Sequence, residues 1–214
     1  MAAGIINSPE IDKQLKLYAD LLLDYNARVN LISRKSTRVD VEWHIAHCLR
    51  ILKKPFEPGT KVIDWGSGGG LPAIPLAIAC SDIEVIAVET TGKKAVAIQH
   101  FMSELGLENL KVWRGRAEEY PGKYHYSTSR ATASLVRLWS WHIRGHIPIT
   151  TSPETWQPGL IALKGGVLGP EIDELRKRYP KCIATQEPVG DVLGKASDDK
   201  YLVHVTRSIG RVDR

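Results

Sequence analysis

Glycines crowd one short stretch of the sequence, IDWGSGGGLPAIPLA at residues 63–77, where an apolar run stops at Gly66, Gly68, Gly69 and Gly70. A strand, a glycine-rich turn and a helix place free backbone N–H groups and the positive end of a helix dipole at one point. Glycine is needed there when a ligand approaches too closely for a Cβ atom. The stretch therefore predicts a site for a nucleotide-like ligand at the end of a strand.

The glycine spacing separates two kinds of nucleotide-like ligand. The dinucleotide fingerprint G-x-G-x-x-G, read from Gly66, needs a third glycine where this chain has Leu71. A frame begun two residues later fails as well, because it ends on alanine. The pattern present is G-x-G-x-G, with Gly70 as its last glycine, and it resembles the first motif of the class I S-adenosylmethionine (SAM)-dependent methyltransferases. An NAD dehydrogenase is the least favoured candidate function.

An acidic residue accompanies the glycine turn. Glu89 ends the next apolar run, at residues 84–89. A carboxylate at the end of that strand accepts hydrogen bonds from ribose hydroxyl groups. NAD enzymes and methyltransferases both use this arrangement, so Glu89 indicates a nucleoside ligand without choosing between them.

The elements that must position these residues alternate along the chain from residue 61. Apolar runs predict strands at 61–65, 84–89, 110–114, 125–129 and 160–164, with weaker ones at 182–188 and 201–207. Helices are predicted between them at 71–80, 93–105, 134–144 and 170–178. Two helices precede them, one with an apolar face from Ile11 to Val29 and one at about 39–52.

This alternation predicts the fold class. We expect an α/β protein with a doubly wound, mostly parallel seven-stranded sheet, closed by an antiparallel hairpin of the last two strands. Residues 1–57 are interpreted as a helical extension packed on the core, and residues 58–214 as the ligand-binding domain.

Composition and charge narrow the class of protein. The chain has 214 residues, 43% of them hydrophobic and 25% charged, with a net charge of +5 and a pI of about 9.1. It has no apolar run long enough to span a membrane, no secretory signal, and three scattered cysteines, so we expect a cytoplasmic protein. Clusters such as Arg34-Lys35 fit either a solvated surface or a polyanionic partner such as RNA.

Several further stretches resemble one family, in the same order along the chain. They read DYNARVNLIS at 24–33, WHIAHCLRIL at 43–52, GSGGGLPAIPLAI at 66–78, GRAEEY at 115–120, SRATASL at 129–135 and ALKGG at 162–166. Together they resemble the bacterial 16S ribosomal RNA guanine-N7 methyltransferases, the RsmG or GidB family, over nearly the whole chain. The resemblance implies SAM as cofactor and 16S rRNA of the small ribosomal subunit as partner.

The resemblance also implies roles for single residues. Gly66 and Leu71 would contact SAM, Ala117 and Glu118 would line its adenine, Arg130 would lie at the cofactor and the entering base, and Lys164 would stand near the RNA. With the residues argued above, the predicted cofactor-binding set is Gly66, Ser67, Gly68, Gly70, Leu71, Glu89, Ala117, Glu118 and Arg130. The predicted RNA-binding set is Arg34, Lys35, Arg137 and Lys164.

Arg130 is the predicted catalytic residue. It follows the fourth strand, whose carboxyl end meets the glycine turn in the crevice of such a sheet. Guanine N7 carries a free lone pair, so attack on the sulfonium methyl group requires no general base, and catalysis rests on holding N7 in line with it. Arg130 cannot hold N7 itself. It can bind the cofactor carboxylate, a phosphate or the guanine O6 atom.

The sequence departs from the family pattern in two places. The second helix of the family reads His-Ile-x-Asp-Ser, and here the last two positions are His47 and Cys48. The fourth strand of the family opens with Phe-Asp, and here it reads Tyr124-His125. Both changes are expected to remove a carboxylate near the crevice, which leaves the role of the second helix open.

Aromatic and histidine residues carry further alternatives. Trp139, Trp141 and Arg137 could receive an unstacked base, or the two tryptophans could belong to the core of a helix. The histidine pairs at 44/47 and 142/146 have the spacing of metal ligands, but without a third ligand we predict no metal site.

Two other functions remain open beside rRNA methylation. One is a methyltransferase of the same fold that acts on a small molecule, and the other is a non-catalytic RNA-binding relative. We expect a monomer.

Overall fold

The computed structural model describes residues 8–130 and 132–207. Its strands form one seven-stranded sheet of order β3-β2-β1-β4-β5-β7-β6. The strands are β1 (Lys61–Trp65), β2 (Glu84–Glu89), β3 (Leu110–Arg114), β4 (Tyr126–Arg130), β5 (Leu160–Gly165), β6 (Cys182–Pro188) and β7 (Lys200–Arg207). The helices are α2 (Pro9–Asn26), α3 (Arg38–Leu49), α4 (Ala73–Ala79), α5 (Gly92–Glu104), α6 (Leu135–Gly145) and α7 (Gly169–Arg178), with 3-10 turns η1 (Arg50–Lys53) and η2 (Ala117–Glu119).

The topology confirms the predicted fold class. β1 to β5 pair in parallel, whereas β7 runs antiparallel to both β5 and β6. β7 therefore lies between its neighbours and completes the predicted closing hairpin. The chain leaves β1 for β2 on one side and returns to β4 on the other, so the order of the strands reverses between β1 and β4. A crevice at this reversal is where ligands bind in open α/β sheets.

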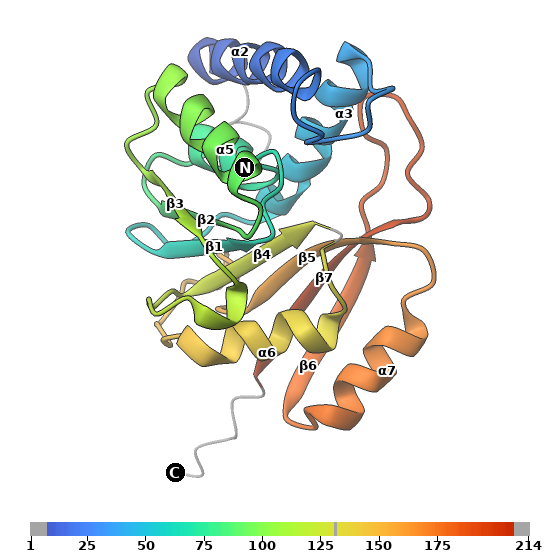
Figure 1. Ribbon diagram of the computed structural model, residues 1–214. Coiled ribbons are helices and arrows are strands. Elements are labelled where there is room, and N and C mark those ends of the chain that lie inside the picture. The colour runs from blue at the N-terminus through green and yellow to red at the C-terminus, as the bar shows by residue number, and fades with distance from the viewer. Residues whose placement is uncertain (1–7, 131, 208–214) are drawn as a thin grey trace.

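Helices cover both faces of the sheet. Figure 1 shows α2, α3 and α5 on one face and α6 and α7 on the other. Alternate residues of β1 point to opposite faces, so Val62 packs in the core under the first group and Ile63 in the core under the second. The first core also contains Tyr18, Leu22 and Val41, which joins the N-terminal helices to the sheet in one apolar layer. The predicted boundary at residue 57 stays a prediction.

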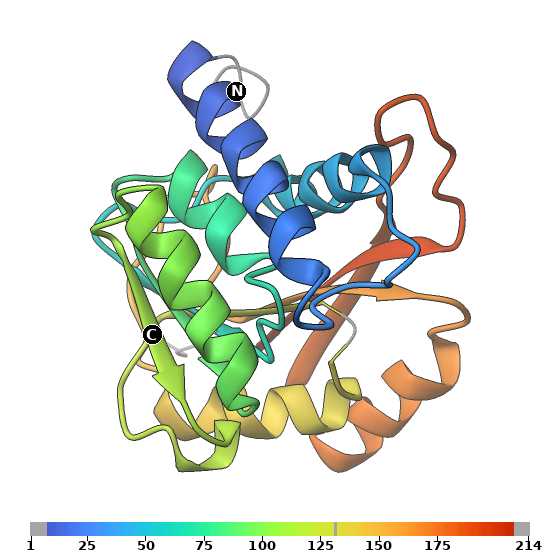
Figure 2. The same ribbon diagram turned by 45° about the horizontal axis from the view of Figure 1, so that its top comes forward.

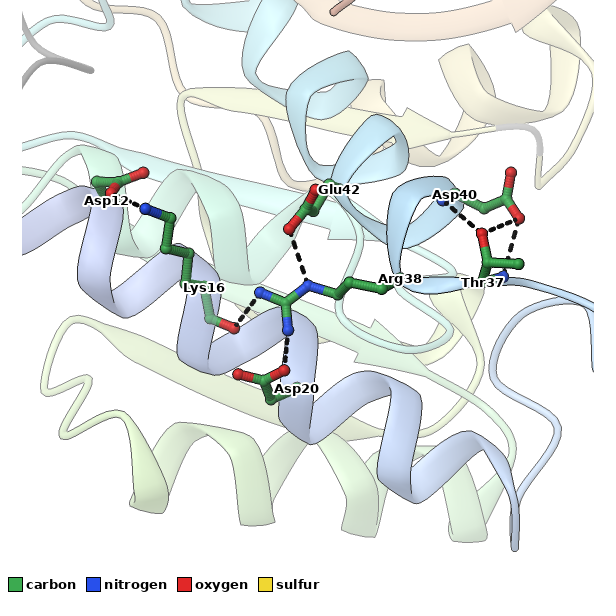
Figure 3. A network of polar contacts seen from close by, with 7 residues as sticks. All are labelled: Asp12, Lys16, Asp20, Thr37, Arg38, Asp40 and Glu42. Carbon is green, nitrogen blue, oxygen red and sulfur yellow. Dashed lines mark hydrogen bonds and ion pairs between the residues drawn. The ribbon is translucent and has the colours of Figure 1, made fainter.

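Arg38 connects the two N-terminal helices. Its guanidinium forms an ion pair with Asp20, bonds Glu42 at 2.9 Å, and donates to the main-chain oxygen of Lys16 at 3.2 Å (Figure 3). A capping box begins α3, because Thr37 and Asp40 each accept a hydrogen bond from the other's backbone N–H. These contacts fix the loop between α2 and α3 against the rest of the molecule.

Some element ends differ from the sequence-based prediction. α2 ends at Asn26 and not at Val29, because the Asn26 side chain accepts hydrogen bonds from the N–H groups of Leu31 and Ile32 and turns the chain there. The second helix stops at Leu49 and continues as the 3-10 turn η1. β4 begins and ends one residue later than predicted, which makes Arg130 its last residue.

The loop between β6 and β7 reaches the N-terminal helices. The guanidinium of Arg50 donates to the main-chain oxygen of Val189 at 3.1 and 2.8 Å, and Lys53 forms an ion pair with Glu187. Figures 1 and 2 both show this loop beside α3. The segment after α3 and the loop between β6 and β7 are therefore held together. Within residues 8–130 and 132–207, no helix is long and apolar enough to cross a membrane.

Candidate functional site: a nucleoside crevice beside Arg130

The glycine turn follows β1 directly and folds over the end of β2. The backbone N–H groups of Gly66 and Ser67 donate to the main-chain oxygen of Val88 at 2.9 and 3.0 Å. Gly66, Gly68 and Gly70 have φ angles of 72°, 58° and 96°. Residues with a Cβ rarely adopt these angles, so the turn itself selects glycine at the three positions of the motif.

The glycines of the turn serve two different purposes. A Cβ on Gly66 would lie 2.3 Å from Thr132, and one on Gly70 would lie 2.4 Å from Ile74. At these two positions, side chains of the protein itself occupy the space that a Cβ would need. A Cβ on Gly68 would approach nothing closer than a main-chain oxygen at 4.0 Å. Gly68 is thus the position where the turn leaves room for a ligand.

Glu89 holds the turn in place. Its carboxylate accepts a hydrogen bond from the N–H of Gly68 at 2.8 Å and another from the N–H of Thr91 at 2.7 Å, and the residue is buried. A carboxylate has about four lone-pair sites, so both bonds leave capacity for a hydroxyl donor. Glu89 therefore shapes the turn and still offers an acceptor to a ribose.

A cavity of about 330 Å³ opens beside the turn. It brings together Gly66, Ala117, Glu118 and Arg137 from separate parts of the chain. Its remaining lining residues are Val88, Thr90, Arg116, Thr132, Ala133 and Trp141. The volume lies at the small end of the range for ligand pockets. The predicted adenine residues Ala117 and Glu118 therefore share one cavity with the glycine turn.

Arg137 and the tryptophans of α6 belong to this cavity and to the core. The Arg137 guanidinium bonds Glu118 at 3.1 Å and lies 5.2 Å from the ring centre of Trp141. The Glu118 backbone N–H and the Arg137 side chain hold the pKa of the Glu118 carboxyl below its usual value. Trp139 and Trp141 are both buried in the second core. The core interpretation of the tryptophans is therefore confirmed, and Trp141 also forms a wall of the cavity.

Arg130 ends β4 next to the glycine turn. Two residues later, the Thr132 hydroxyl donates at 3.3 Å to the main-chain oxygen of Gly66, which ties the loop after β4 to the turn. On its other side Arg130 lies near α3. Burial, and after it the charge of Arg130, lowers the pKa of His44 and of His47 to about 4. Arg130 thus lies near both the glycine turn and α3.

Asp64 is a buried acid beneath the crevice that sequence reasoning did not include in the site. Burial raises its pKa to about 7, against hydrogen bonds from Ser67 and Thr128 and the charge of Arg130 that lower it. Its Oδ2 atom has no hydrogen-bond partner among the described residues. The signal available in the sequence was an acid inside an otherwise apolar strand, just before the turn.

The predicted RNA-binding residues lie in different settings. Arg34 and Lys35 are exposed in the loop after α2. The Lys164 ammonium is largely buried and donates to the main-chain oxygen of Ala133 and to Glu171, both at 2.9 Å. Lys164 therefore fastens the loop after β4. Its contact with RNA stays a prediction.

The two positions that depart from the family pattern, at His47 and His125, lie in different parts of the structure. His47 is buried on α3 and stacks on Trp43, with ring centres 4.9 Å apart. The positive charge of Arg130 contributes to the lowered pKa of His47. His125 precedes β4, and its Nδ1 atom accepts a hydrogen bond from the N–H of Lys61 at 2.9 Å. Since Lys61 begins β1, His125 lies at the amino edge of the sheet. The expectation that it borders the crevice was wrong.

No group of three or more potential metal ligands occurs within the two described stretches of the chain. Cys48 and Cys182 are buried as free thiols, and burial raises the pKa of Cys48 to about 12. A buried neutral thiol is a poor nucleophile.

Solved structures share this fold at low sequence identity. A precorrin-6y C5,15-methyltransferase from Geobacter metallireducens aligns with a TM-score of 0.54 and 10% identity, covering 76% of this chain and 86% of that one. A ribosomal protein L11 methylase from Lactobacillus delbrueckii subsp. bulgaricus has a TM-score of 0.54 and 13% identity, covering 80% of each chain. The fold is therefore Rossmann-like, of the kind that these two methyltransferases have.

Sequence relatives give the family within that class. The sequence model of the GidB family, described as rRNA small subunit methyltransferase G, matches residues 11–195, and this chain belongs to that family. A ribosomal RNA small subunit methyltransferase G from Salinibacter ruber is 42% identical over 184 residues, 86% of each chain. One from Chlorobium luteolum is 41% identical over 210 residues, 94% of this chain and 84% of that protein. The predicted family, enzyme class and cofactor are thereby confirmed.

Proposed function

We propose that this protein transfers the methyl group of SAM to N7 of a guanine in 16S rRNA of the small ribosomal subunit. The observation that carries the proposal is the open position at Gly68, whose N–H is held by Glu89, on a turn that the Thr132 hydroxyl ties to the loop after Arg130. The names of the relatives supply the ribosomal RNA, and the sequence resemblance supplies guanine N7.

The residues of the crevice fit a bound nucleoside. Gly68 leaves space for it, the free lone pairs of Glu89 can accept from ribose hydroxyls, and the cavity with Ala117 and Trp141 can take the adenine. Ser67, Gly66, Gly70 and Leu71 shape the turn around it. Bound SAM supplies an electrophilic methyl group, and the chain's own residues orient what attacks it.

Arg130 is the proposed catalytic residue. Guanine N7 uses its own lone pair, so the crevice needs no general base, and the purine becomes cationic as the methyl group arrives. The permanently charged guanidinium binds guanine O6, a phosphate or the cofactor carboxylate and thereby fixes the angle of attack. A lysine is a point charge and would fix that angle less well.

The two competing functions make different demands on the chain. A small-molecule methyltransferase has no need of the exposed Arg34 and Lys35 in the N-terminal loop. A non-catalytic relative has no need of the open Gly68 and the buried Glu89. We also propose that the protein acts as a monomer in the cytoplasm, where ribosomal subunits are assembled.

The test is incubation of the protein with isotope-labelled SAM and small ribosomal subunits that lack the modification. Nucleoside mass spectrometry of the 16S rRNA should then detect labelled N7-methylguanosine. Calorimetry should show binding of SAM and none of NAD. Subunits that stay unlabelled, with SAM bound normally, would contradict the proposal and favour one of the two competing functions.

A further inference from the structure

A second cavity, larger than the one beside the glycine turn, lies against α3. It has a volume of about 480 Å³, between α3, the loop after α2 and the loop between β6 and β7. Its lining residues are Ser33, Lys35, Ser36, Asp40, Trp43, His44, Lys195, Ala196, Ser197, Asp199 and Lys200. We call it the basic cavity. Figure 2 shows the three segments that form it gathered around the same end of α3.

Lysines give the basic cavity a surplus of positive charge. Lys35 and Lys195 are exposed and form no ion pair with any residue described by the structure. The two carboxylates of the lining are already engaged. Asp40 accepts the N–H and the hydroxyl of Thr37 in the capping box, and Asp199 pairs with Lys200. Two ammonium groups are therefore free to bind an anion.

Aromatic and imidazole groups face the same cavity. His47 stacks on one face of the Trp43 ring with an interplanar angle of 9°, so the cavity meets the other face or the edge of the indole. The Lys195 ammonium lies 5.8 Å from the Trp43 ring centre. The Nε1 atom of Trp43 and the Nδ1 atom of His44 are buried without a partner among the described residues. Buried polar atoms without partners are rare in folded proteins and call for an explanation.

The charge of Arg130 reaches one residue that lines the basic cavity. Arg130 and Lys195 both lower the pKa of His44, after the larger effect of burial, so His44 lies near both cations. With a pKa of about 4, the imidazole is neutral at physiological pH and can exchange hydrogen bonds with an uncharged base. Positive charge, aromatic surface and buried polar atoms without a partner among the described residues therefore meet at the basic cavity.

We propose that the basic cavity binds one unstacked nucleotide of the RNA strand next to the methylated guanine. Lys35 and Lys195 hold its phosphodiester groups, and Trp43 and His44 contact its base. Single-stranded RNA is bound in this way, by cations that follow the backbone and by aromatic rings that receive bases. The inference rests on the proposed function for the identity of the RNA.

The first experiment measures how the full-length protein binds unmethylated small subunits at several salt concentrations. The double variant Lys35→Ala/Lys195→Ala should bind about tenfold more weakly than the wild type. The slope of log affinity against log salt should become shallower by about 1.4, since each single-strand phosphate contact contributes about 0.7. The KM for the subunit should rise with the dissociation constant, while kcat and the affinity for SAM stay within about twofold.

A matched control removes two lysines at the opposite edge of the sheet. Lys123 precedes β4 and Lys181 precedes β6, and both are exposed. The Lys123→Ala/Lys181→Ala variant has the same net charge as the test variant and should bind subunits like the wild type. Equal affinity and equal salt slope in the test and control variants would overturn the inference.

A second pair of variants tests the aromatic contact. Trp43→Phe keeps a ring for stacking and should retain most of the affinity, whereas Trp43→Leu should lose about tenfold. SAM affinity and the thermal midpoint, measured on both, show whether the helix is still folded. Equal affinity of the two folded variants would remove Trp43 from the RNA contact.

The outcomes distinguish the inference from the function on which it rests. If the wild type binds subunits but forms no N7-methylguanosine, the proposed function fails, and the binding data still decide whether the basic cavity holds RNA. If the wild type does not bind subunits at all, both fail.

Discussion

The glycine turn and the basic cavity are built in different ways. The turn is held through its backbone N–H groups, that of Gly66 on the Val88 carbonyl and that of Gly68 on the Glu89 carboxylate. The basic cavity is lined by side chains, and its free cations, Lys35 and Lys195, lie on two exposed loops. The first suits a ligand of one fixed shape, and the second suits a flexible polymer that adjusts to its binding surface.

The largest expected effect on methyl transfer is that of substituting Arg130. Arg130→Ala should lower kcat for methyl transfer by about 10²–10³-fold, because a fixed charge at the reacting atoms is lost. Arg130→Lys should recover only part of that loss, since a point charge cannot bind two acceptors at once. Single-turnover rates on unmethylated subunits measure the effect, with circular dichroism as a check on folding. A fully active Arg130→Ala variant would remove Arg130 from the reaction.

A smaller effect separates the two purposes of the turn glycines. Gly68→Ala should stay folded, with a cost of about 1 kcal/mol for its positive φ, yet bind SAM at least tenfold more weakly because the Cβ enters the ligand space. Gly70→Ala should instead lower the thermal midpoint by several degrees, because its Cβ would lie 2.4 Å from Ile74. Calorimetry with SAM and thermal unfolding of both variants give the comparison. Normal SAM affinity in Gly68→Ala would show that the ligand does not approach there.

Glu89→Gln should have the next smaller effect, on SAM affinity alone. The glutamine oxygen can keep one of the two N–H groups of Gly68 and Thr91 but not both, and it accepts a ribose hydroxyl less strongly than a charged group. We expect SAM to bind about tenfold more weakly and the KM for the subunit to stay unchanged. A change in the subunit KM of similar size would mean that the two cavities are coupled through the turn.

The smallest effect concerns stability against pH on the side of α3. The pKa of His47 is about 4 in the folded protein and 6.5 in the unfolded chain. Between pH 4 and pH 6.5, the imidazole is therefore protonated in the unfolded chain and neutral in the folded protein. The neutral His47 side chain therefore makes its full contribution to the free energy of unfolding above pH 6.5. This contribution is lost as the pH falls towards 4. His47→Asn should show a flatter profile over this range in urea unfolding. Parallel profiles of variant and wild type would contradict the buried neutral imidazole.

The glycine turn could be predicted from the sequence because its constraints are local. Positive φ angles select glycine at Gly66, Gly68 and Gly70, and a strand end selects the position of Glu89, so a short motif contains the geometry. The parallel sheet followed from the alternation of apolar runs in the same way. Helix ends were less predictable, since a single side chain, Asn26, ends α2 by bonding the backbone beyond it.

The basic cavity could not be predicted from the sequence because its residues meet only in the folded chain. Lys35, Trp43 and Lys195 belong to three segments and share no spacing. The position of His125 could have been predicted, because the strand expected at 125–129 begins with it and Arg130 follows the other end. Burial also decided the state of Asp64, whose raised pKa depends on the helices packed above it.

The bonds from Arg50 to Val189 have a consequence for how the protein is made. The two residues are 139 positions apart, and they hold the loop that carries Lys195 against the helix that carries Trp43. During synthesis α3 leaves the ribosome long before that loop exists, so the wall of the basic cavity closes only when nearly the whole chain has emerged. Contacts between distant parts of a chain also form slowly. The nascent protein can therefore assemble its glycine turn early, whereas the surface that would grip RNA is completed last.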